Sequence, residues 1–425
     1  MSWALPTTQC LDPYRPSLRK RDHWSSLLER HDAVTDGLVV VHCTVEWLPR
    51  ADTWIYGQMA NTQAFAPIVL ADRLSEPCEF HWEPLIVASP WERQVLRFSA
   101  KVGLRPIPRS HRSALARYDP AILHSHFGDR GWWDIGVRRV CGAKHIVTFY
   151  GYDVSLLPRQ EPVWRRRYIE LFDKADLILC EGPFMARTLV ALGCPEEKVN
   201  VQPLGVDVDR IKYRERVPSS KVRILIAGSF REKKGIPIAL EAVARAQAEA
   251  GNLEVTIIGD AAGAECEKAE KRAILDMIRR RELEPIVKLL GYQPYERLLG
   301  EAYRHDVFLS PSVTASDGDT EGGAPVAIID MAATGLPVVS SRHCDIPQVV
   351  KDGVTGLLAE ERDVEGLAER LIMLARDAEL RRIMGKAGRR HVEERYDVRR
   401  LVPRLENVYK RLLTSPAPGP SVNAR

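Results

Sequence analysis

The residues best suited to chemistry lie in one short stretch, from Ser310 to Met331. The stretch opens with small polar residues and continues as a loop that carries Asp317, Asp319 and Glu321. Two glycines, an alanine and a proline follow, and after them an apolar run with the composition of a helix. Carboxylates accept hydrogen bonds from hydroxyl groups, whereas backbone N–H groups at a helix start bind anions. The pattern therefore predicts a ligand with an anionic part and a neutral, hydroxyl-bearing part.

The tetrapeptide Gly322-Gly323-Ala324-Pro325 marks the start of the predicted helix. Its two glycines leave their backbone N–H groups unscreened, and a proline suits the first helical turn because its missing donor is not needed there. A diphosphate docked at this point would gain hydrogen bonds from N–H groups and the favourable end of the helix dipole. The alternative interpretation is a tight strand-to-helix turn with no ligand, which the tetrapeptide alone would favour.

A parallel sheet is the expected support for this loop. Short β-branched runs alternate with helix-like stretches in the first half of the chain, which is typical of buried parallel strands. The pattern restarts in the second half. The first series comprises 38–41, 67–70, 146–149 and 177–180, and the second comprises 222–227, 253–258, 287–290, 307–310 and 337–340.

The two series predict an α/β fold with two Rossmann-like, doubly wound domains that face each other across a cleft. A charged stretch that ends in Pro-Ser-Ser separates them and is interpreted as a linker. A final amphipathic helix could pack back on the N-terminal domain, and a Pro-rich tail follows. The expected boundaries are 1–207 for the first domain, 208–220 for the linker, 221–400 for the second domain, 401–414 for the helix and 415–425 for a disordered tail.

Composition excludes several other classes of protein. The 61 basic and 57 acidic residues nearly cancel to a net charge of +4, so the chain lacks the basic surface of a nucleic-acid binder. The eight cysteines lie far apart, without the paired spacing of a zinc site, and are expected to be free thiols in a reducing compartment. No apolar run is long enough to span a bilayer, and residues 1–24 lack the apolar core of a secretory signal. These features predict a cytoplasmic protein.

A fixed order of motifs surrounds the acidic loop. Together these motifs resemble the retaining glycosyltransferases of family 4, especially the branch that forms exopolysaccharides of the colanic-acid type, and the resemblance implies the GT-B fold. It covers nearly all of the C-terminal domain. The motifs are Pro203–Asp207, Ala227–Gly235, Ile258–Asp260, Leu290–Tyr292, Gly335–Val339, Ile346–Val350 and Asp352–Leu358.

The resemblance implies roles for two acidic residues in the second domain. Glu321 matches the glutamate that holds hydroxyls of the donor sugar, and Asp330 matches the carboxylate that holds the ribose of the nucleotide. In the family, seven residues separate two glutamates at these positions. Here eight residues separate Glu321 from Asp330, with an extra glycine in the loop, and the side chain of Asp330 is one methylene shorter than that of a glutamate. Gly291 and Tyr292 complete the implied nucleoside site.

The resemblance also implies which residues contact the diphosphate. Lys234 matches the lysine that contacts the diphosphate in relatives, and a cation there would neutralise charge on the leaving group. The alternative is an exposed lysine in the first turn of a helix. Ser229 stands where the family usually has an arginine, and Arg231, two residues later, is a candidate to replace it. The backbone of residues 322–325 completes this expected subsite.

In the first domain, residues 124–128 and 147–153 also resemble the exopolysaccharide branch. Relatives have a histidine near the anomeric carbon at the position of Tyr150. A phenol donates a hydrogen bond but does not share the protonation of a histidine near neutral pH. His126 is a candidate to compensate, although a histidine at the end of a buried strand is more often structural. We therefore expect Tyr150 and His126 at the reaction centre, with Asp153 on the acceptor side.

Two aromatic segments of the first domain have open interpretations. Trp54 lies where the family has a loop over the acceptor cleft, and its ring could stack on a sugar or belong to the core. The segment Trp164–Tyr168 contains three arginines and is interpreted first as a solvated helix face. Contact with a membrane surface at the inner face of the cell membrane is the second interpretation.

The resulting hypothesis is a metal-independent retaining glycosyltransferase without a cofactor. It would move a sugar from a nucleoside diphosphate donor, with UDP favoured and GDP possible, to a glycan, lipid-linked or small-molecule acceptor. The acidic loop could be mistaken for a metal site, but nearby cationic side chains provide an alternative to Mg²⁺. The rival hypotheses are a nucleotide-sugar epimerase-like enzyme on the same fold and a catalytically weak sugar-nucleotide-binding partner protein.

Overall fold

The computed structural model describes residues 37–47, 53–75, 82–101, 103–217 and 219–414. Residues Val39–Arg425 belong to one compact unit that holds two sheets. The segments 1–24, 48–52 and 415–425, for which the sequence raised expectations, lie outside the described residues.

The first sheet has seven strands, with β4 (Ile122–His126) at its centre. Its inner strands are almost entirely buried, as parallel strands covered by helices require, whereas the three-residue strands at its two edges are partly exposed. The five strand pairs whose registers are defined, β2–β3, β1–β4, β4–β5, β5–β6 and β6–β7, are parallel. In sheet order the strands are β3 (Leu85–Val87), β2 (Phe65–Leu74), β1 (Leu38–Trp47), β4 (Ile122–His126), β5 (Lys144–Thr148), β6 (Leu177–Cys180) and β7 (Val199–Val201).

Helices connect the strands of this sheet and form, with it, the first lobe (residues 39–201). Helix α5 packs against α8 through Trp132, Trp164 and Tyr168, which belong to one buried aromatic cluster. The helices are α2 (Thr53–Ala60), α3 (Pro90–Lys101), α4 (Arg109–Tyr118), α5 (Gly128–Cys141), α6 (Tyr152–Ser155), α7 (Leu157–Gln160), α8 (Val163–Lys174) and α9 (Pro183–Ala191), with a 3₁₀ turn, η2 (Glu196–Lys198).

The second sheet has six strands, and all five neighbouring pairs are parallel. Its first strand along the chain, β8, lies between β9 and β11, so the strand order is that of a Rossmann fold. In sheet order the strands are β10 (Val287–Leu289), β9 (Leu253–Ile258), β8 (Val222–Ala227), β11 (Val307–Ser310), β12 (Val338–Ser341) and β13 (Gly356–Ala359).

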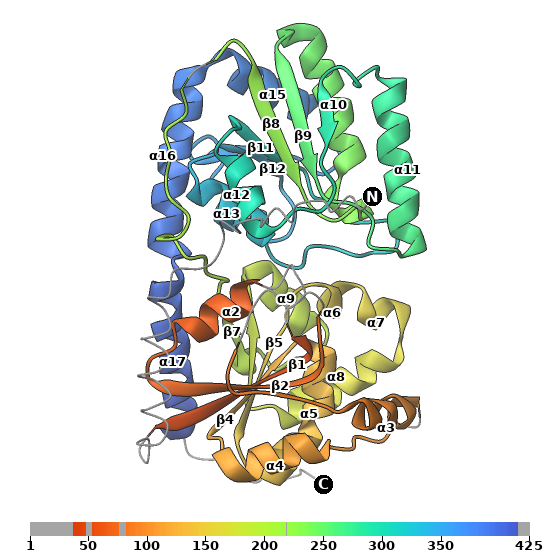
Figure 1. Cartoon of the computed structure of the whole chain (residues 1–425), viewed down its shortest axis with the longest axis vertical. Helices are drawn as coiled ribbons and strands as arrows, with labels where there is room; N and C mark the ends of the chain where they lie inside the picture. The colour runs from red at the N-terminus through yellow and green to blue at the C-terminus, as the bar shows by residue number, and fades with distance from the viewer. Residues whose placement is uncertain (1–36, 48–52, 76–81, 102, 218, 415–425) are drawn as a thin grey trace, which may run out of the picture. The chain divides into compact units, whose positions relative to one another are not determined.

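The helices around the second sheet complete the second lobe (residues 222–395; Figure 1). Residues from β8, β9, α10 and α15 share one large apolar cluster on one side of the sheet. The helical elements are η3 (Glu232–Lys234), α10 (Ile236–Ala250), α11 (Glu265–Arg280), α12 (Tyr295–Ala302), α13 (Val326–Ala333), α14 (Ile346–Val349), α15 (Val364–Arg376) and α16 (Ala378–Arg395).

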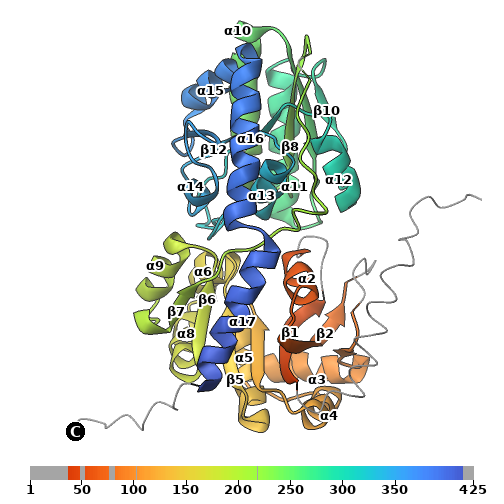
Figure 2. The ribbon, with the colours of Figure 1, turned by 90° about the vertical axis from the view of Figure 1, so that its left-hand side faces the viewer.

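The last helix, α17 (Val398–Thr414), follows α16 but packs on the first sheet, as Figures 1 and 2 both show. Its Leu405, Val408 and Tyr409 share a buried cluster with β1, β4, β5 and β6. The Tyr409 hydroxyl also lies 2.7 Å from Nδ1 of His124 in β4. The core of the first lobe is therefore completed by the end of the chain.

The stretch expected to be a linker packs on the second lobe. Val208 and Ile211 lie in an apolar cluster with β8 and α13, and their carbonyl groups accept hydrogen bonds from Arg389 of α16. Arg216 donates to carbonyl groups at the ends of α12 and α13, including that of Ala302. This segment is held in place along the described part of its length. The domain boundaries remain a prediction.

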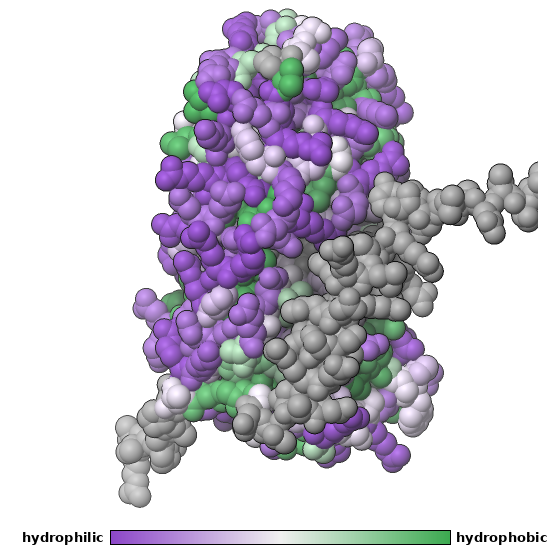
Figure 3. Space-filling model, turned by 60° about the vertical axis from the view of Figure 1, so that its left-hand side comes forward, coloured by the Kyte–Doolittle hydropathy of each residue, from purple (hydrophilic) through white to green (hydrophobic). Residues whose placement is uncertain are grey.

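No helix among the described residues is long and apolar enough to cross a membrane. On the face that Figure 3 draws, the coloured residues are mostly hydrophilic and the apolar ones form separate patches. Helix α16 is likewise hydrophilic, because Arg382, Arg390 and Arg395 are interspersed with acidic residues along it.

Candidate functional site

The candidate site lies where the strand order of the second sheet reverses, between β8 and β11. Ligands of doubly wound folds bind at this point, beyond the carboxyl ends of the strands. β8 leads into the turn that holds Lys234, and β11 leads into the acidic loop that ends at Glu321. Two segments almost ninety residues apart in the sequence are therefore brought together by the fold.

Glu321 and Lys234 form a partly buried ion pair at this point. Lys234 Nζ lies 2.9 Å from the Glu321 carboxylate, and Ser312 Oγ donates to Oε1 of Glu321 over 2.9 Å. Burial alone would raise the pKa of Glu321, but Lys234, Lys233 and Ser312 outweigh it and lower the pKa to about 2. The carboxylate is therefore ionised at neutral pH, and it is held by a cation that can also face a phosphate.

Asp319 is the acidic residue that anchors the loop. Its two oxygens face two cations, Arg231 at 2.9 Å and Lys233 at 3.2 Å. Asp317 accepts a hydrogen bond from the backbone N–H of Asp319, over 2.9 Å. Lys233 also donates to the carbonyl group of Thr320. The acidic loop is thus neutralised by protein cations, and the guanidinium of Arg231 is committed to it.

Sequence reasoning missed Lys233. The motif directed attention to Lys234, which is partly exposed, whereas Lys233 is buried with its ammonium group against the loop. A pair of adjacent lysines gave no signal about which one faces the ligand site and which one supports it.

The loop after Glu321 touches the first lobe through two glycines. Gly322 has φ +74°, and a Cβ there would lie 2.4 Å from Cα of Gly151; a Cβ on Gly151, at φ +140°, would lie 2.5 Å from the carbonyl oxygen of Glu321. Side chains at either position would force these backbones apart. The glycines next to Glu321 and Tyr150 therefore allow two predicted site residues to approach.

The start of α13 carries a contact that the sequence did not suggest. Glu181, which directly follows β6, accepts a hydrogen bond from the backbone N–H of Ala324. A Cβ on Gly323 would lie 2.1 Å from Oε2 of Glu181. The helix start expected to bind an anion thus meets a carboxylate of the first lobe. Nothing in the sequence around Glu181 signalled this role.

Asp330 lies on α13 and pairs with a tyrosine. Burial raises its pKa to about 7, although a hydrogen bond from Tyr295 and the charge of Arg210 act in the opposite direction. Arg210 lies over the Tyr295 ring, 5.1 Å from its centroid. Tyr295 and Arg210 were not predicted. Asp330 therefore belongs to a buried polar group, and its ribose-binding role stays a prediction.

The other predicted nucleoside residues follow β10. Gly291 adopts φ +66°, and its carbonyl group accepts a hydrogen bond from Gly259. Tyr292 is 42% exposed, so its ring is accessible. These two residues lie in a turn at the carboxyl edge of the second sheet, the same edge as Lys234.

Tyr150 and His126 lie together in the first lobe. The Tyr150 hydroxyl is 2.6 Å from Nδ1 of His126, and Nε2 of His126 is 2.9 Å from Nδ1 of His42 on β1. Burial lowers the pKa of His126 well below its usual value, and that of His42 to about 3. The three side chains form a buried, uncharged chain of hydrogen bonds that fixes the phenol.

His42, His124 and His126 bring ring nitrogens within 4.8 Å of one another, a grouping that meets the distance requirement of a metal site. The sequence did not suggest it, because His42 comes from another strand. Five of their six ring nitrogens, however, already have partners: His124 contacts Tyr409 and Thr148, and only Nε2 of His42 has none. The group fits a hydrogen-bond network better than a metal site.

Asp153 and Trp54, which were placed on the acceptor side, have structural surroundings. The buried Asp153 carboxylate accepts from the backbone N–H groups of Gly128, Tyr150 and Gly151 at 2.8–3.0 Å. It therefore fixes the turn that presents Tyr150. The Trp54 ring lies 5.7 Å from the Tyr150 ring, and its indole nitrogen is buried. Acceptor contact by either residue stays a prediction.

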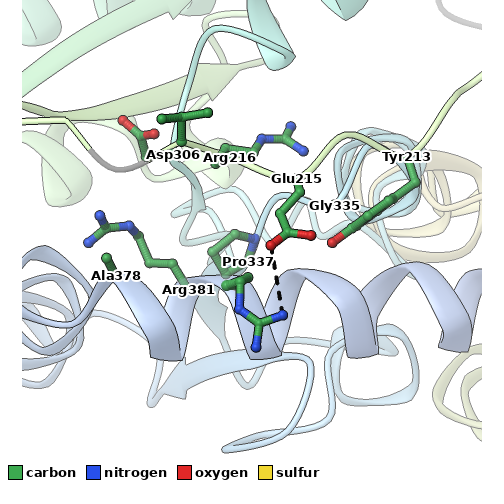
Figure 4. Close-up of a pocket in the computed structure, with 10 residues that line it drawn as sticks. Tyr213, Glu215, Arg216, Asp306, Gly335, Pro337, Ala378 and Arg381 are labelled. Carbon is green, nitrogen blue, oxygen red and sulfur yellow. Dashed lines mark ion pairs between the residues drawn. The ribbon is translucent and has the colours of Figure 1, made fainter.

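A separate small pocket lies at the amino edge of the second sheet (Figure 4). Arg216, Arg381 and Asp306 line it, and no predicted site residue does. Arg216 and Arg381 donate to carbonyl groups at helix ends; Arg381, for example, donates to Leu374 and Ala375 at the end of α15. Arg382, which also lines the pocket, forms ion pairs with Glu215 and Glu379. This pocket is therefore a junction of helix ends.

Two family models match consecutive parts of the chain. Residues 62–210 match the model described as Glycosyltransferase Family 4, and residues 207–391 match Glycosyl transferases group 1. Together the two matches run from the first lobe through the whole candidate site. The chain belongs to glycosyltransferase family 4. The resemblance inferred from the motifs is thereby confirmed.

Among the curated members of this family, amylovoran biosynthesis glycosyltransferase AmsK of Erwinia amylovora is 37% identical over 258 residues, which is 60% of this chain and 61% of the relative. Putative colanic acid biosynthesis glycosyltransferase WcaL of Salmonella typhimurium is 33% identical over 261 residues, again 60% of this chain and 61% of the relative. The matched part thus spans about three fifths of these relatives.

Solved structures confirm the expected fold. Sucrose-phosphate synthase from Thermosynechococcus elongatus superposes with a TM-score of 0.69 at 18% identity, over 88% of this chain and 99% of that chain. Anabaena HepE in complex with UDP-glucose gives the same TM-score at 16% identity, with the same coverage of both chains. At such identities the likeness concerns the fold alone: two parallel α/β sheets, as in GT-B glycosyltransferases of this family.

Proposed function

We propose that this family 4 member is a retaining glycosyltransferase that moves a sugar from a nucleoside diphosphate donor to an acceptor. The Lys234–Glu321 pair at the reversal point of the second sheet carries the proposal. Lys234 offers a positive charge to a diphosphate, and Glu321 offers an ionised carboxylate to sugar hydroxyls. The acceptor would be a glycan, a lipid-linked molecule or a small molecule.

The two curated relatives are named for amylovoran and colanic acid biosynthesis, which supports a role in making a cell-surface polysaccharide or glycoconjugate. The HepE structure contains UDP-glucose, which supports UDP as the donor nucleotide, with GDP as the second candidate. We place the reaction in the cytoplasm, with peripheral contact at the inner face of the cell membrane, by analogy with the family.

The chemistry proposed for the site is stabilisation of the leaving group. The acceptor oxygen attacks the anomeric carbon from the side of the departing diphosphate, the bond from that carbon to the diphosphate breaks, and the acceptor proton passes to a phosphate oxygen. Lys234 and the start of α13 would hold the charge that develops on the diphosphate. The Tyr150 phenol, fixed by His126 at 2.6 Å, would face the sugar as a neutral group. The protein thus supplies positioning and charge, without a covalent intermediate.

A thermal-shift panel of UDP, GDP and their sugar conjugates tests this function directly. A true donor should raise the melting temperature in a concentration-dependent way, because it binds only the folded state. Slow hydrolysis of the same donor in the absence of acceptor would then separate an enzyme from a binding protein. If no nucleotide stabilises the chain, the proposal is wrong; binding without hydrolysis or transfer would favour the sugar-nucleotide-binding partner protein.

A further inference from the structure

Glu181 lies at the carboxyl end of β6, in the first lobe, yet its carboxylate contacts the second lobe. It accepts a hydrogen bond from Ala324 N–H at the start of α13. Its Oε2 also lies so close to Gly323 that a Cβ there would be 2.1 Å away. A first-lobe acid therefore reaches the backbone that follows Glu321, the residue assigned to the donor sugar.

Several carboxylates gather around this point. Asp345, Asp153 and Glu321 all act on Glu181 electrostatically, and together with burial they raise its pKa well above the usual range. Two of the three are committed to holding the fold. Asp345 accepts from the backbone N–H groups at the start of α9, and Asp153 accepts from the turn at Tyr150. Glu181 contacts the helix start instead, within electrostatic reach of Glu321, the residue assigned to the donor sugar.

The charge of this cluster indicates which part of a donor fits beside Glu181. An anionic diphosphate would be repelled by so many carboxylates, and the cation Lys234 provides a better place for it. A hydroxyl group, in contrast, can donate to the Glu181 carboxylate and accept from Ala324 N–H at the same time. A sugar hydroxyl placed between the side chain of Glu181 and the backbone N–H of Ala324 would therefore form hydrogen bonds with both.

We propose that Glu181 is a specificity-determining residue that receives a hydroxyl of the donor sugar, beside Glu321 and next to the Ala324 N–H. The inference rests on the proposed function and deepens it by assigning a second carboxylate, from the other lobe, to sugar recognition. In the donor-free chain the same carboxylate satisfies the Ala324 N–H.

The test compares the dissociation constant of a nucleoside diphosphate with that of its sugar conjugate, measured by calorimetry on the full chain. Glu181→Leu keeps the approximate size and removes both side-chain oxygens. We expect the sugar conjugate to bind roughly three- to tenfold more weakly, because a hydrogen bond to a sugar hydroxyl is lost, and the free diphosphate to bind within about twofold of wild type. Glu197→Leu, at an exposed glutamate of the same lobe, is the matched control.

Other outcomes are equally clear. Unchanged binding of both ligands by Glu181→Leu would overturn the proposal. Tighter binding of the free diphosphate would also overturn it, because Glu181 would then be competing with the diphosphate itself. Glu181→Asp, one methylene shorter, gives a second measurement: it should also lose sugar affinity while melting within a few degrees of wild type. If wild type binds no nucleotide at all, the proposed function has failed, and not this assignment alone.

Discussion

At the scale of single residues, the ion pair of Lys234 and Glu321 links both halves of the expected donor. The ammonium group neutralises the carboxylate when no donor is present and would contact the diphosphate when one binds. Glu321 remains ionised because Lys234, Lys233 and Ser312 outweigh its burial. A sugar hydroxyl would therefore meet a strong acceptor. Substitution of Glu321 should therefore mainly lower the transfer rate, and substitution of Lys234 should mainly weaken nucleotide binding.

Glu321→Gln should lower transfer far more than it lowers the affinity for UDP or GDP. The substitution keeps the shape and removes one charge-assisted hydrogen bond, which is worth roughly 1.5–3 kcal/mol and corresponds to a ten- to hundredfold slower reaction. Transfer rates and nucleotide dissociation constants, measured on the same preparation, check this. Asp319→Asn serves as the comparison: we expect it to lower the melting temperature, because Asp319 anchors Arg231 and Lys233. The opposite result is also informative. If Glu321→Gln transfers sugar at the wild-type rate, and Asp319→Asn loses transfer while melting like wild type, then Asp319 holds the sugar instead of Glu321.

The same carboxylate makes stability depend on pH. The pKa of Glu321 in the folded chain is about 2, below the ordinary glutamate value of 4.5, so its ionised form stabilises the fold. That contribution is fully present above about pH 4.5 and is lost as the pH falls towards 2. Between pH 5 and pH 3 wild type should lose about 2 kcal/mol more stability than Glu321→Gln, as urea unfolding can measure. Parallel pH profiles for the two proteins would contradict it.

Lys234→Ala should weaken binding of the free nucleoside diphosphate by roughly ten- to hundredfold, because a charge-assisted contact to the diphosphate is removed. Calorimetry with UDP and GDP measures this. Lys288→Ala, which removes an exposed lysine of the same lobe, is the control and should bind like wild type. Unchanged affinity for both nucleotides in Lys234→Ala would remove this residue from the donor site.

At the scale of elements, strands were predicted well where they are long and buried. The run 222–227 is β8, 253–258 is β9 and 307–310 is β11, because continuous apolar runs leave few alternatives inside a parallel sheet. Strands β3, β4, β7 and β13 were missing from the predicted series. Strands β3 and β7 have only three residues each, too few to show a period, β4 contains two histidines and a serine, and β13 begins with a glycine. The acidic loop and helix start were identified from local composition alone.

Contacts between distant elements were not predictable from one sequence. Glu181 reaches Ala324 only because the end of β6 meets the start of α13, and His42 reaches His126 only because β1 and β4 are neighbours in the first sheet. Lys233 likewise becomes a buried partner of Asp319 only once the loop folds back on it. Local motifs gave residue types and spacing, whereas pairing across the chain depends on register and on the positions of the sheets.

The contact between Asp345 and α9 is an element-scale feature that can be tested. Asp345 follows β12, and its carboxylate accepts from the N–H groups of Phe184, at 2.8 Å, and Met185, at 3.3 Å, at the start of α9. Asp345→Ala should reduce the free energy of unfolding by about 1–2 kcal/mol, the usual cost of losing a helix cap. Hydrogen exchange at these two amides should accelerate. Asp276→Ala, an exposed acid on α11, is the control; unchanged exchange in Asp345→Ala would contradict the assignment.

At the scale of the whole molecule, the end of the chain supplies part of the first lobe's core. Val206 pairs with Asp397 in an isolated bridge, so the path out of the first lobe and the return path to it run side by side. Helix α17 then buries Leu405, Val408 and Tyr409 against the first sheet. A first lobe without α17 would expose that apolar face, so its stability should depend on residues some two hundred positions further along the chain.

Leu405→Ala tests this dependence in the full chain. Leu405 is 2% exposed, and removal of a buried leucine side chain costs about 2–5 kcal/mol, through lost burial and the cavity left behind. Urea unfolding should show this loss, whereas Arg404→Ala, at the neighbouring exposed position, should unfold like wild type. At temperatures where Leu405→Ala remains folded, its affinity for the nucleoside diphosphate should stay unchanged, because Lys234 and α13 belong to the second lobe. Equal stability of the two variants would show that α17 contributes little to the stability of the first lobe. Weaker nucleotide binding in Leu405→Ala would show that the packing of α17 also sets the geometry of the donor site.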